Sequence, residues 1–300
     1  MKWFLDWDGT IAIKSTLATD ASIGYRKNIG QSLPPWPHFT RAYVEDRQTI
    51  GEFRKPIKGQ NPNLEQYLTW QRDLVTAERA SIERIEKAGL FANVTEDDVI
   101  ATAEKAVADG IVPLRRGLLS LFERLHSRGD SLAVLSVNWS SVFIREVLRS
   151  SAQKAHESGF LSSLCIHSNE IDFGTNGKLS RKFPEEDRGI WTAQDKARVM
   201  QRELGPKLRQ RPSSVYVGDE STDLACLLAA DLGICIRDEP LSAEQKALKE
   251  ALELLGIECS SLTDWEKASG EDGTGKKHLW WIRDFSQILD SPLLTTSGIK

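Results

Sequence analysis

Two aspartates near the start of the chain have the type and spacing needed for chemistry on a phosphate group. Asp6 and Asp8 directly follow Trp3-Phe4-Leu5, a short apolar run typical of a buried strand. A carboxylate at a strand end can attack phosphorus and form an aspartyl-phosphate, the role we predict for Asp6. Asp8 would protonate the leaving oxygen and later activate water. Gly9 would let the chain turn sharply and bring its backbone close to a ligand.

Further polar residues follow two other runs that are typical of buried strands. Ser136 follows the run 132–135, and the run 215–217 leads into Gly218, Asp219 and Asp223. Ligands of open α/β sheets bind at the carboxyl ends of the strands, so we expect these groups to gather around Asp6. Asp219 would supply a third carboxylate. Asp223, one helical turn later, would hold the waters of a metal ion or orient a neighbour.

Carboxylates that surround a phosphate dianion need positive charge. A divalent cation with hard oxygen ligands would supply it, and Mg²⁺ is the natural choice. Lys196 would balance the remaining negative charge, because it follows the capping pattern of Thr192 to Asp195 and so lies at a helix N-terminus, which favours anions. Lys178 and Lys182 lie earlier in the chain and compete for this role. The hydroxyl of Ser136 would donate to a phosphoryl oxygen.

Short apolar runs alternate with helical patterns through the second half of the chain. The runs are 132–135, 215–217 and 232–236, and the helical stretches are roughly 114–128, 139–150, 193–204, 222–230 and 242–255. This alternation, together with the opening strand, predicts an α/β fold with a doubly wound parallel sheet.

Three segments lie outside this alternation. Residues 14–112 contain no convincing buried strand, so we predict a helical insertion after the first strand. Residues 171–179 are typical of a hairpin that turns at Asn176-Gly177. Residues 270–300 are expected to form a Gly-rich linker and an aromatic amphipathic helix, since Trp281, Phe285 and Ile288 recur at helical spacing.

Composition narrows the class of protein without identifying its chemistry. The chain has 300 residues, 40% hydrophobic and 27% charged, with a net charge of −4, which is ordinary for a globular protein and gives no electrostatic case for nucleic-acid binding. No apolar run approaches a membrane span, and the first apolar stretch is interrupted by aspartates, unlike a signal peptide. Four cysteines without a C-x-x-C pair favour a reducing compartment, so we expect a cytoplasmic protein.

Four motifs in this chain resemble those of the haloacid dehalogenase-like (HAD) hydrolase superfamily. Asp6-Trp7-Asp8-Gly9-Thr10 is similar to the DxDGT motif, and Leu135-Ser136 is similar to the second motif at a strand end. Lys196 resembles the third motif, and the stretch from Gly218 to Asp223 resembles the fourth, GDxxxD. All four occur in the order of the family.

The resemblance covers about 1–13 and 113–240 at the level of motifs. It implies a Rossmann-like core of residues 1–13 and 113–269 and a helical cap of the C1 type at 14–112, as in phosphoserine phosphatase. The second aspartate separates phosphatases and phosphomutases from dehalogenases. Ser136 is followed by Val137-Asn138-Trp139 and not by the Gly-rich sequence of phosphoserine phosphatases, which argues against phosphoserine as substrate.

The implied activity is Mg²⁺-dependent hydrolysis of a small phosphomonoester through an aspartyl-phosphate. The metal would be held by Asp6, the backbone carbonyl of Asp8 and Asp219. Support for these ligands is expected from Thr10 and Asp223, and contacts to the substrate from Gly9, Asn138 and Gly218. The partner would be a small phosphorylated metabolite, with no nucleic acid and no membrane, and the sequence leaves monomer and homodimer open.

Two alternatives stay open at this point. A phosphotransferase or phosphomutase would pass the phosphoryl group to an acceptor other than water. A weakly catalytic binding or regulatory protein would use the cap and the C-terminal helix as an interface. Trp7 and Trp139 flank the motif residues and are favoured as core residues over substrate contacts. Arginines of the inserted segment, among them Arg47, could meet an anionic substrate, although most such residues are surface charges.

Overall fold

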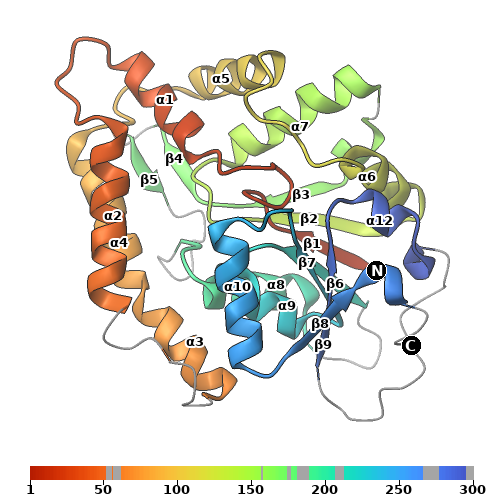
Figure 1. The fold of residues 1–300 in the computed structure, drawn as a ribbon. Helices are drawn as coiled ribbons and strands as arrows, with labels where there is room; N and C mark the ends of the chain where they lie inside the picture. Colours follow the sequence, from red (N-terminus) through yellow and green to blue (C-terminus); the bar gives the residue numbers. More distant parts are fainter. Residues whose placement is uncertain are drawn as a thin grey trace.

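A seven-stranded sheet forms the centre of the computed structural model (Figure 1). The described residues are 1–51, 56, 62–156, 158–173, 177–180, 189–206, 213–265 and 277–294. In sheet order the strands are β3 (Leu164–His167), β2 (Ser131–Leu135), β1 (Lys2–Leu5), β6 (Ser214–Gly218), β7 (Leu232–Ile236), β9 (His278–Ile282) and β8 (Glu258–Ser261). All neighbours pair in parallel, which confirms the predicted α/β class with a parallel sheet.

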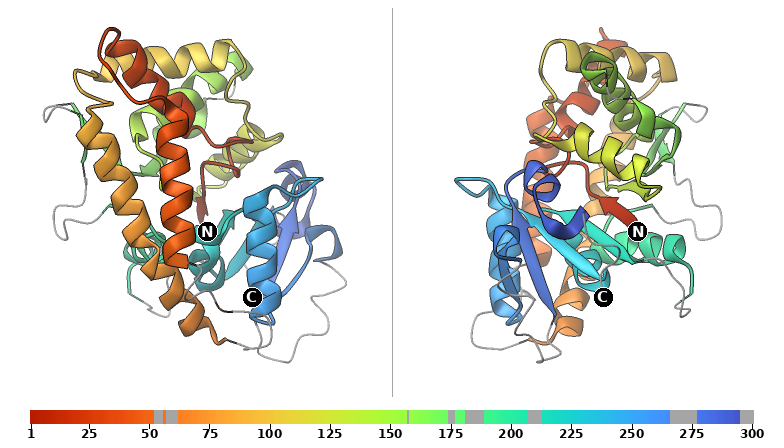
Figure 2. Two further views of the ribbon diagram at one scale, coloured as in Figure 1. Left: turned by 60° about the vertical axis from the view of Figure 1, so that its left-hand side comes forward. Right: turned by 90° about the vertical axis from the view of Figure 1, so that its right-hand side faces the viewer.

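Helices cover both faces of the sheet because successive strand residues point to opposite sides. Trp3 and Leu5 pack in one apolar cluster, and Phe4 packs in the other. The first face is covered by α6 (Leu118–Ser127), α7 (Ser141–Ala155) and α12 (Ser286–Leu289), and the second by α8 (Ala193–Leu204), α9 (Leu224–Ala229) and α10 (Ala243–Leu254) (Figures 1 and 2). The sheet is therefore doubly wound, as the alternating sequence pattern predicts.

The segment 14–112 is helical in its described residues and contains no strand there. Its helices are α1 (Leu17–Lys27), α2 (Trp36–Gly51), α3 (Leu64–Asp73), α4 (Val75–Ala88) and α5 (Glu96–Ala108). Helices α2 and α4 pack side by side, and α5 packs on α7 of the sheet layer (Figure 2). The inserted segment thus contacts the sheet layers closely. Its description as a separate cap with the bounds 14–112 stays a prediction.

A second, two-stranded sheet lies beside α4. Strands β4 (Glu170–Asp172) and β5 (Lys178–Ser180) pair antiparallel, in agreement with the predicted hairpin. The backbone N–H of Leu179 donates to Glu86 of α4 at 2.9 Å. Asn176 lies outside the described residues, as does Lys182. Short 3-10 helices complete the structure: η1 (Gly159–Ser162), η2 (Ser221–Asp223), η3 (Leu262–Asp264) and η4 (Pro292–Leu294).

The C-terminal segment differs from the prediction of an aromatic amphipathic helix. Residues 278–282 form strand β9, which lies between β7 and β8, and only four residues, 286–289, form α12. Leu279 and Ile282 are fully buried in opposite apolar clusters, so the run alternates as a strand and not as a helix. The sheet takes these residues because β9 supplies the backbone partners that β7 and β8 would otherwise lack. The predicted linker, 270–275, lies outside the described residues.

No helix among the described residues is long and apolar enough to cross a membrane.

Candidate active site

Three carboxylates meet where the carboxyl ends of β1 and β6 lie side by side. Asp6 directly follows β1, and Asp219 and Asp223 follow β6. One oxygen of each carboxylate lies within 4.8 Å of the others, and all three residues are buried. The parallel pairing of β1 with β6 therefore brings together aspartates that are more than 200 residues apart in the chain.

Lys196 places its ammonium group between two of these carboxylates. Its Nζ lies 2.8 Å from Asp6 Oδ1 and 2.8 Å from Asp223 Oδ1, and its side chain is completely buried. Thr192 caps α8 through a reciprocal capping box with Asp195, which fixes the first turn that carries Lys196. Burial disfavours the charged amine, but Asp223 and Asp6 outweigh this effect and raise the pKa of Lys196. The ammonium therefore stays charged.

Each carboxylate oxygen of Asp223 accepts two hydrogen bonds. Its Oδ1 accepts hydrogen bonds from Lys196 and from the Tyr216 hydroxyl, at 2.8 Å and 2.7 Å. Its Oδ2 accepts from the backbone N–H groups of Asp219 and Glu220 at 3.0 Å and 3.1 Å. A Cβ at Gly218 would lie 2.4 Å from Asp223 Cγ, so a residue without a side chain is needed there. Asp223 thus orients Lys196 and the loop after β6.

The loop after β1 is shaped around Asp219. Gly9 has a φ of +75°, a conformation that favours glycine, and a Cβ there would lie 2.3 Å from Asp219 Oδ2. Thr10 donates its hydroxyl to Asp219 Oδ1 at 2.9 Å. Gly9 and Thr10 therefore allow the loop after β1 to pack closely against the carboxylate of Asp219, which follows the neighbouring strand β6.

The carboxylate cluster fits a divalent cation. Burial, followed by the charge of Asp223, raises the pKa values of Asp6 and Asp219 well above their ordinary range, which reflects uncompensated negative charge. The carboxylates of Asp6 and Asp219 offer the hard oxygen donors that Mg²⁺ prefers. Because Asp223 is saturated by nitrogen and hydroxyl donors, it suits the supporting role that the sequence predicts.

The Asp8 carboxylate is held apart from this cluster. Its Oδ1 accepts from the backbone N–H and the hydroxyl of Thr16 at 2.5 Å and 2.8 Å, and its Oδ2 accepts from Asn138 Nδ2 at 3.3 Å. Desolvation raises the pKa of Asp8, while the Thr16 and Asn138 hydrogen bonds act in the opposite direction. Asp8 is one of the residues that line a cavity above the site.

Ser136 and Asn138 occupy the loop after β2. The Ser136 hydroxyl accepts from the backbone N–H of Asn138 at 3.0 Å, and both residues are completely buried. The Asn138 amide also contacts Thr16 Oγ1 and Asp20 Oδ2, at 3.0 Å each, and its Oδ1 accepts from the backbone N–H of Ser140. Its polar atoms are thus used within the protein. In this structure Asn138 positions Asp8, and the absence of a side chain at Gly218 makes room for Asp223. Their contacts to a substrate stay a prediction.

Asp20 is a site residue that sequence reasoning missed. It lies on the buried face of α1 with Ala21, Ile23 and Gly24, and its Oδ1 has no hydrogen-bond partner among the described residues. Burial, together with the charge of Asp8, raises the pKa of Asp20 well above its ordinary range. An aspartate on the apolar face of a predicted helix is a visible signal, because buried carboxyl groups usually have a structural or chemical role.

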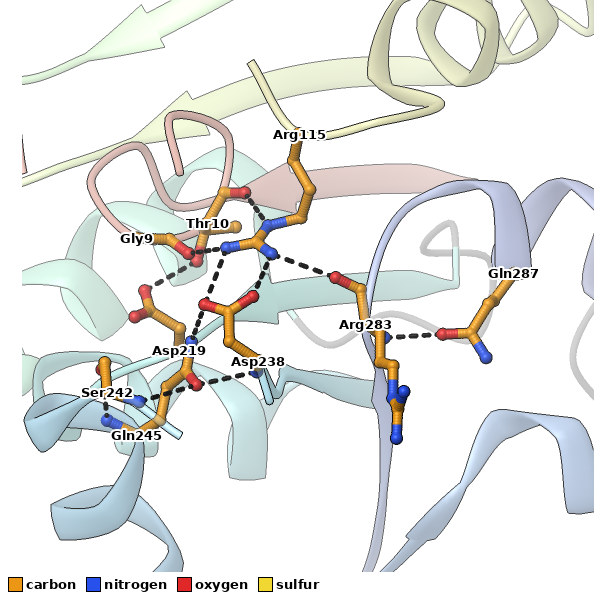
Figure 3. Close-up of polar contacts among 9 residues, drawn as sticks. All are labelled: Gly9, Thr10, Arg115, Asp219, Asp238, Ser242, Gln245, Arg283 and Gln287. Carbon is orange, nitrogen blue, oxygen red and sulfur yellow. Dashed lines mark hydrogen bonds and ion pairs between the residues drawn. The ribbon is translucent and has the colours of Figure 1, made fainter. Parts of the chain in front are cut away.

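Arg115 is a second residue that the sequence pattern did not identify. It holds the loop after β1, which carries Asp6 and Asp8, in place through hydrogen bonds. It donates to the carbonyl oxygens of Gly9 and Thr10 at 2.6 Å and 2.9 Å, and to Asp238 at 2.6 Å (Figure 3). It also donates to the carbonyl oxygen of Arg283, just after β9, at 3.0 Å. Nothing local in the sequence distinguishes it from the exposed Arg116, because all its partners are distant in the chain.

A cavity of about 520 Å³ opens over this site. Its floor includes Asp8, Gly9 and Asp219, and helix α2 of the inserted segment forms one wall. Trp139 lines it as well, whereas Trp7 is buried and donates its indole N–H to Thr16 at 3.0 Å. The prediction for Trp7 as a core residue therefore agrees with the structure, and Trp139 belongs to both the core and the cavity wall.

Comparisons with known proteins give distant similarities, and no family model matches the chain. The chain is 24% identical to Cold tolerance protein 1 of Saccharomyces cerevisiae, with 95% of each chain covered. It is 29% identical to a CTO1 family protein of Schizosaccharomyces pombe over 53% of this chain and 57% of that protein. It is 25% identical to Bifunctional TH2 protein, mitochondrial, of Arabidopsis thaliana over 66% of this chain, and spans 30% of that protein.

Solved structures with a similar arrangement have low sequence identity. A phosphoserine phosphohydrolase-like protein from Francisella tularensis has a TM-score of 0.49 and 13% identity, with 97% of this chain and 99% of that chain covered. A substrate-bound phosphoserine phosphatase has a TM-score of 0.48 and 14% identity, with 96% and 97% covered. The parallel strand order and the meeting of Asp6, Asp219 and Asp223 with Lys196 agree with the doubly wound α/β core that the sequence predicts.

We expect Arg115→Lys to lower the free energy of unfolding by about 2–4 kcal/mol, because lysine cannot serve Asp238 and three carbonyl oxygens at once and leaves buried acceptors unpaired. Chemical denaturation would measure the loss. The matched control is Arg116→Lys at the exposed neighbouring position, which should change stability by less than about 0.5 kcal/mol. Equal effects of the two substitutions would contradict the role of Arg115.

Asp20→Asn should reduce the loss of stability that accompanies a rise in pH. A carboxyl group whose pKa is raised by folding binds more protons in the folded state, so its stabilising contribution is present below the unfolded pKa of about 3.9 and is lost as the pH rises toward the folded value. The asparagine does not titrate. The free energy of unfolding between about pH 4 and pH 7.5 should therefore fall less in Asp20→Asn than in the unchanged protein.

Denaturation at both pH values, at one fixed Mg²⁺ concentration, would test this expectation. Asp97→Asn, at an exposed position in the first turn of α5, is the control and should follow the unchanged protein. A parallel pH dependence of Asp20→Asn and the unchanged protein would contradict the buried, proton-binding character of Asp20.

Proposed function

We propose that the protein is a Mg²⁺-dependent phosphatase that hydrolyses a small phosphomonoester through an aspartyl-phosphate. The observation that carries this proposal is the buried Lys196, whose ammonium group bridges Asp6 and Asp223 beside Asp219. This arrangement holds a carboxylate nucleophile beside positive charge, next to Asp219, which lines the cavity. Asp8 stands separately, in hydrogen bonds that suit a group that exchanges a proton.

In the first half of the reaction, an oxygen of Asp6 attacks phosphorus. A bond forms between this oxygen and phosphorus, and the bond between phosphorus and the leaving oxygen breaks. Asp8 gives its proton to the leaving oxygen, so the product departs as a neutral alcohol. The raised pKa of Asp8 favours the protonated form that this step needs.

In the second half, water attacks the aspartyl-phosphate. Asp8, now a carboxylate, removes a proton from the water while the water oxygen forms a bond to phosphorus. The bond between phosphorus and the Asp6 oxygen breaks at the same time. Inorganic phosphate leaves and the original protonation state of the two aspartates is restored. Thr16 and Asn138 hold Asp8 in one orientation in both halves, which spares the reorganisation that a free side chain would need.

Asp6, the backbone carbonyl of Asp8 and Asp219 would hold Mg²⁺, with Thr10 and Asp223 supporting them. When bound, the metal supplies positive charge that draws together the carboxylates and the phosphoryl oxygens. Lys196 would add positive charge beside Asp6, and the buried Ser136 would donate its hydroxyl hydrogen to a phosphoryl oxygen.

The substrate would be a small phosphorylated metabolite. The four unpaired cysteines favour a reducing compartment such as the cytoplasm.

Asp6→Asn should lower the turnover of p-nitrophenyl phosphate by about a thousandfold or more, because the amide cannot act as the nucleophile. Circular dichroism would verify that the variant is folded. The control, Asp97→Asn, should keep the activity of the unchanged protein. Full activity of Asp6→Asn would refute its role as the nucleophile.

The ratio of the two products separates hydrolysis from phosphoryl transfer. Release of less than one phosphate ion for each nitrophenol, with an alcohol present, would favour transfer of the phosphoryl group to the alcohol.

Removal of divalent metal with EDTA should abolish turnover, and added Mg²⁺ should restore it. Mg²⁺ should also raise the midpoint of thermal unfolding, because a ligand that binds only the folded state stabilises it. This rise should be lost in Asp219→Asn, which removes one carboxylate of the cluster. Turnover that is insensitive to EDTA, together with an unchanged unfolding midpoint, would exclude the metal role.

A further inference from the structure

The cavity above the carboxylates is lined in part by aromatic rings. Helix α2 contributes Trp36 and Phe39, and the loop after β2 contributes Trp139. The ring centroids of Trp36 and Trp139 are 5.9 Å apart with an interplanar angle of 80°, and those of Trp36 and Phe39 are 6.2 Å apart. The rings therefore meet in a corner on the cavity wall, with Trp36 edge-on to Trp139.

The corner is fixed in place before any ligand arrives. Phe39 and Trp139 are 2% and 7% exposed, and Trp139 also packs edge-on against Phe91 at 5.7 Å. Trp36 is less buried and lines the cavity between these two rings. A ring bound here would lose little energy to reorganisation of the protein, since two of the three aromatic residues are held by the core.

Farther along α2, a polar cluster forms another part of the wall. The Tyr43 hydroxyl donates to Glu78 at 2.6 Å, and Arg47 donates to the same hydroxyl at 3.1 Å. The Arg47 guanidinium also lies over the Tyr43 ring, 5.7 Å from its centroid. Arg47 is thus engaged within the cluster, beside the carboxyl group of Glu78.

The charges of the remaining lining residues disfavour an anionic leaving group. Besides Asp8 and Asp219, the lining includes four acidic residues, Glu78, Glu220, Asp238 and Glu244, against the two basic residues Lys14 and Arg47. Asp238 is paired with Arg115, and Glu78 is hydrogen-bonded in the cluster with Tyr43 and Arg47, so Glu220 and Glu244 remain beside Lys14. A carboxylate on the leaving group, such as that of phosphoserine, would therefore meet more acidic than basic side chains. The attraction of the site is therefore confined to the phosphoryl end of a substrate.

We propose that this cavity selects phosphomonoesters whose leaving group is a flat aromatic ring without an anionic substituent. The ring lies in the corner of Trp36, Phe39 and Trp139, while the phosphoryl group lies at the end of the cavity that Asp8, Gly9 and Asp219 line. The proposal deepens the phosphatase function proposed above and rests on it. A cavity of about 520 Å³ has room for a phosphoryl group and a ring system, in the range of ordinary small-molecule sites.

The test compares benzyl phosphate with cyclohexylmethyl phosphate and 4-carboxybenzyl phosphate in the full-length protein with Mg²⁺. All three release a primary alcohol, so differences in leaving-group chemistry are small and the comparison isolates flatness and charge. We expect kcat/KM for benzyl phosphate to exceed that of each of the others by about tenfold, as two favourable ring contacts would provide. Equal values would overturn the proposal.

Two tryptophan substitutions give a matched pair of variants. Trp36→Leu removes one ring of the corner and should reduce the preference for benzyl over cyclohexylmethyl phosphate to about twofold or less. Trp265→Leu removes a similarly half-buried ring that stacks on Trp280 at a centroid distance of 4.9 Å and lies outside the cavity lining, so the preference should be retained. Retention of the preference in Trp36→Leu would overturn the assignment of the corner.

Binding of phosphonates separates a failure of this proposal from a failure of the phosphatase function. Benzylphosphonate and cyclohexylmethylphosphonate cannot be hydrolysed, and their dissociation constants can be measured by calorimetry in the same two variants. If no phosphate ester is turned over but benzylphosphonate still binds about tenfold more tightly and depends on Trp36, the cavity proposal stands and the phosphatase function fails. If esters are hydrolysed and the two phosphonates bind equally, the cavity proposal fails alone.

Discussion

The candidate site depends on the ammonium group of Lys196 between two buried carboxylates. Each carboxylate alone would be costly to bury, and the two together would repel, so the ammonium group of Lys196 offsets part of the cost of placing Asp6 and Asp223 at this depth. It does not complete the balance. In their ionised forms, Asp6, Asp219 and Asp223 with one ammonium leave two negative charges, which one divalent cation would neutralise. The cluster therefore fits a metal ion.

The central part of this arrangement could be predicted from the sequence because it follows from strand ends. The strands β1, β2, β6 and β7 are short, buried and apolar, so their bounds and the polar residues after them are readable. In a parallel sheet these ends meet at one edge, whatever their separation in the chain. The strands β3 and β8 are less apolar because they lie at the edges, where one side of the strand has no neighbour, and the pattern that identifies a buried strand is weak in them.

What the sequence could not predict depends on contacts between distant residues. Trp281, Phe285 and Ile288 have helical spacing, yet residues 278–282 are a strand because β7 and β8 offer backbone partners on both sides. Arg115 is equally hidden, since its partners are carbonyl oxygens and a carboxylate up to 168 residues away. Such positions are decided by tertiary structure, which overrides local pattern and propensity. Asp20 could be predicted in part, because a carboxylate on the apolar face of a helix is unusual and is visible in the sequence.

The inserted segment has two tasks that are physically connected. Thr16 and Asp20, at the start of α1, hold Asp8 and Asn138, and α2 carries the aromatic wall with Trp36 and Phe39. Residues 28–35 join α1 to α2, so both tasks belong to one continuous stretch of chain. Under the proposed mechanism, a leaving group in the corner would lie in the same cavity as Asp8, its proposed proton donor. Binding energy gained away from phosphorus is then available for alignment at phosphorus, and a poorly fitting leaving group loses turnover as well as affinity.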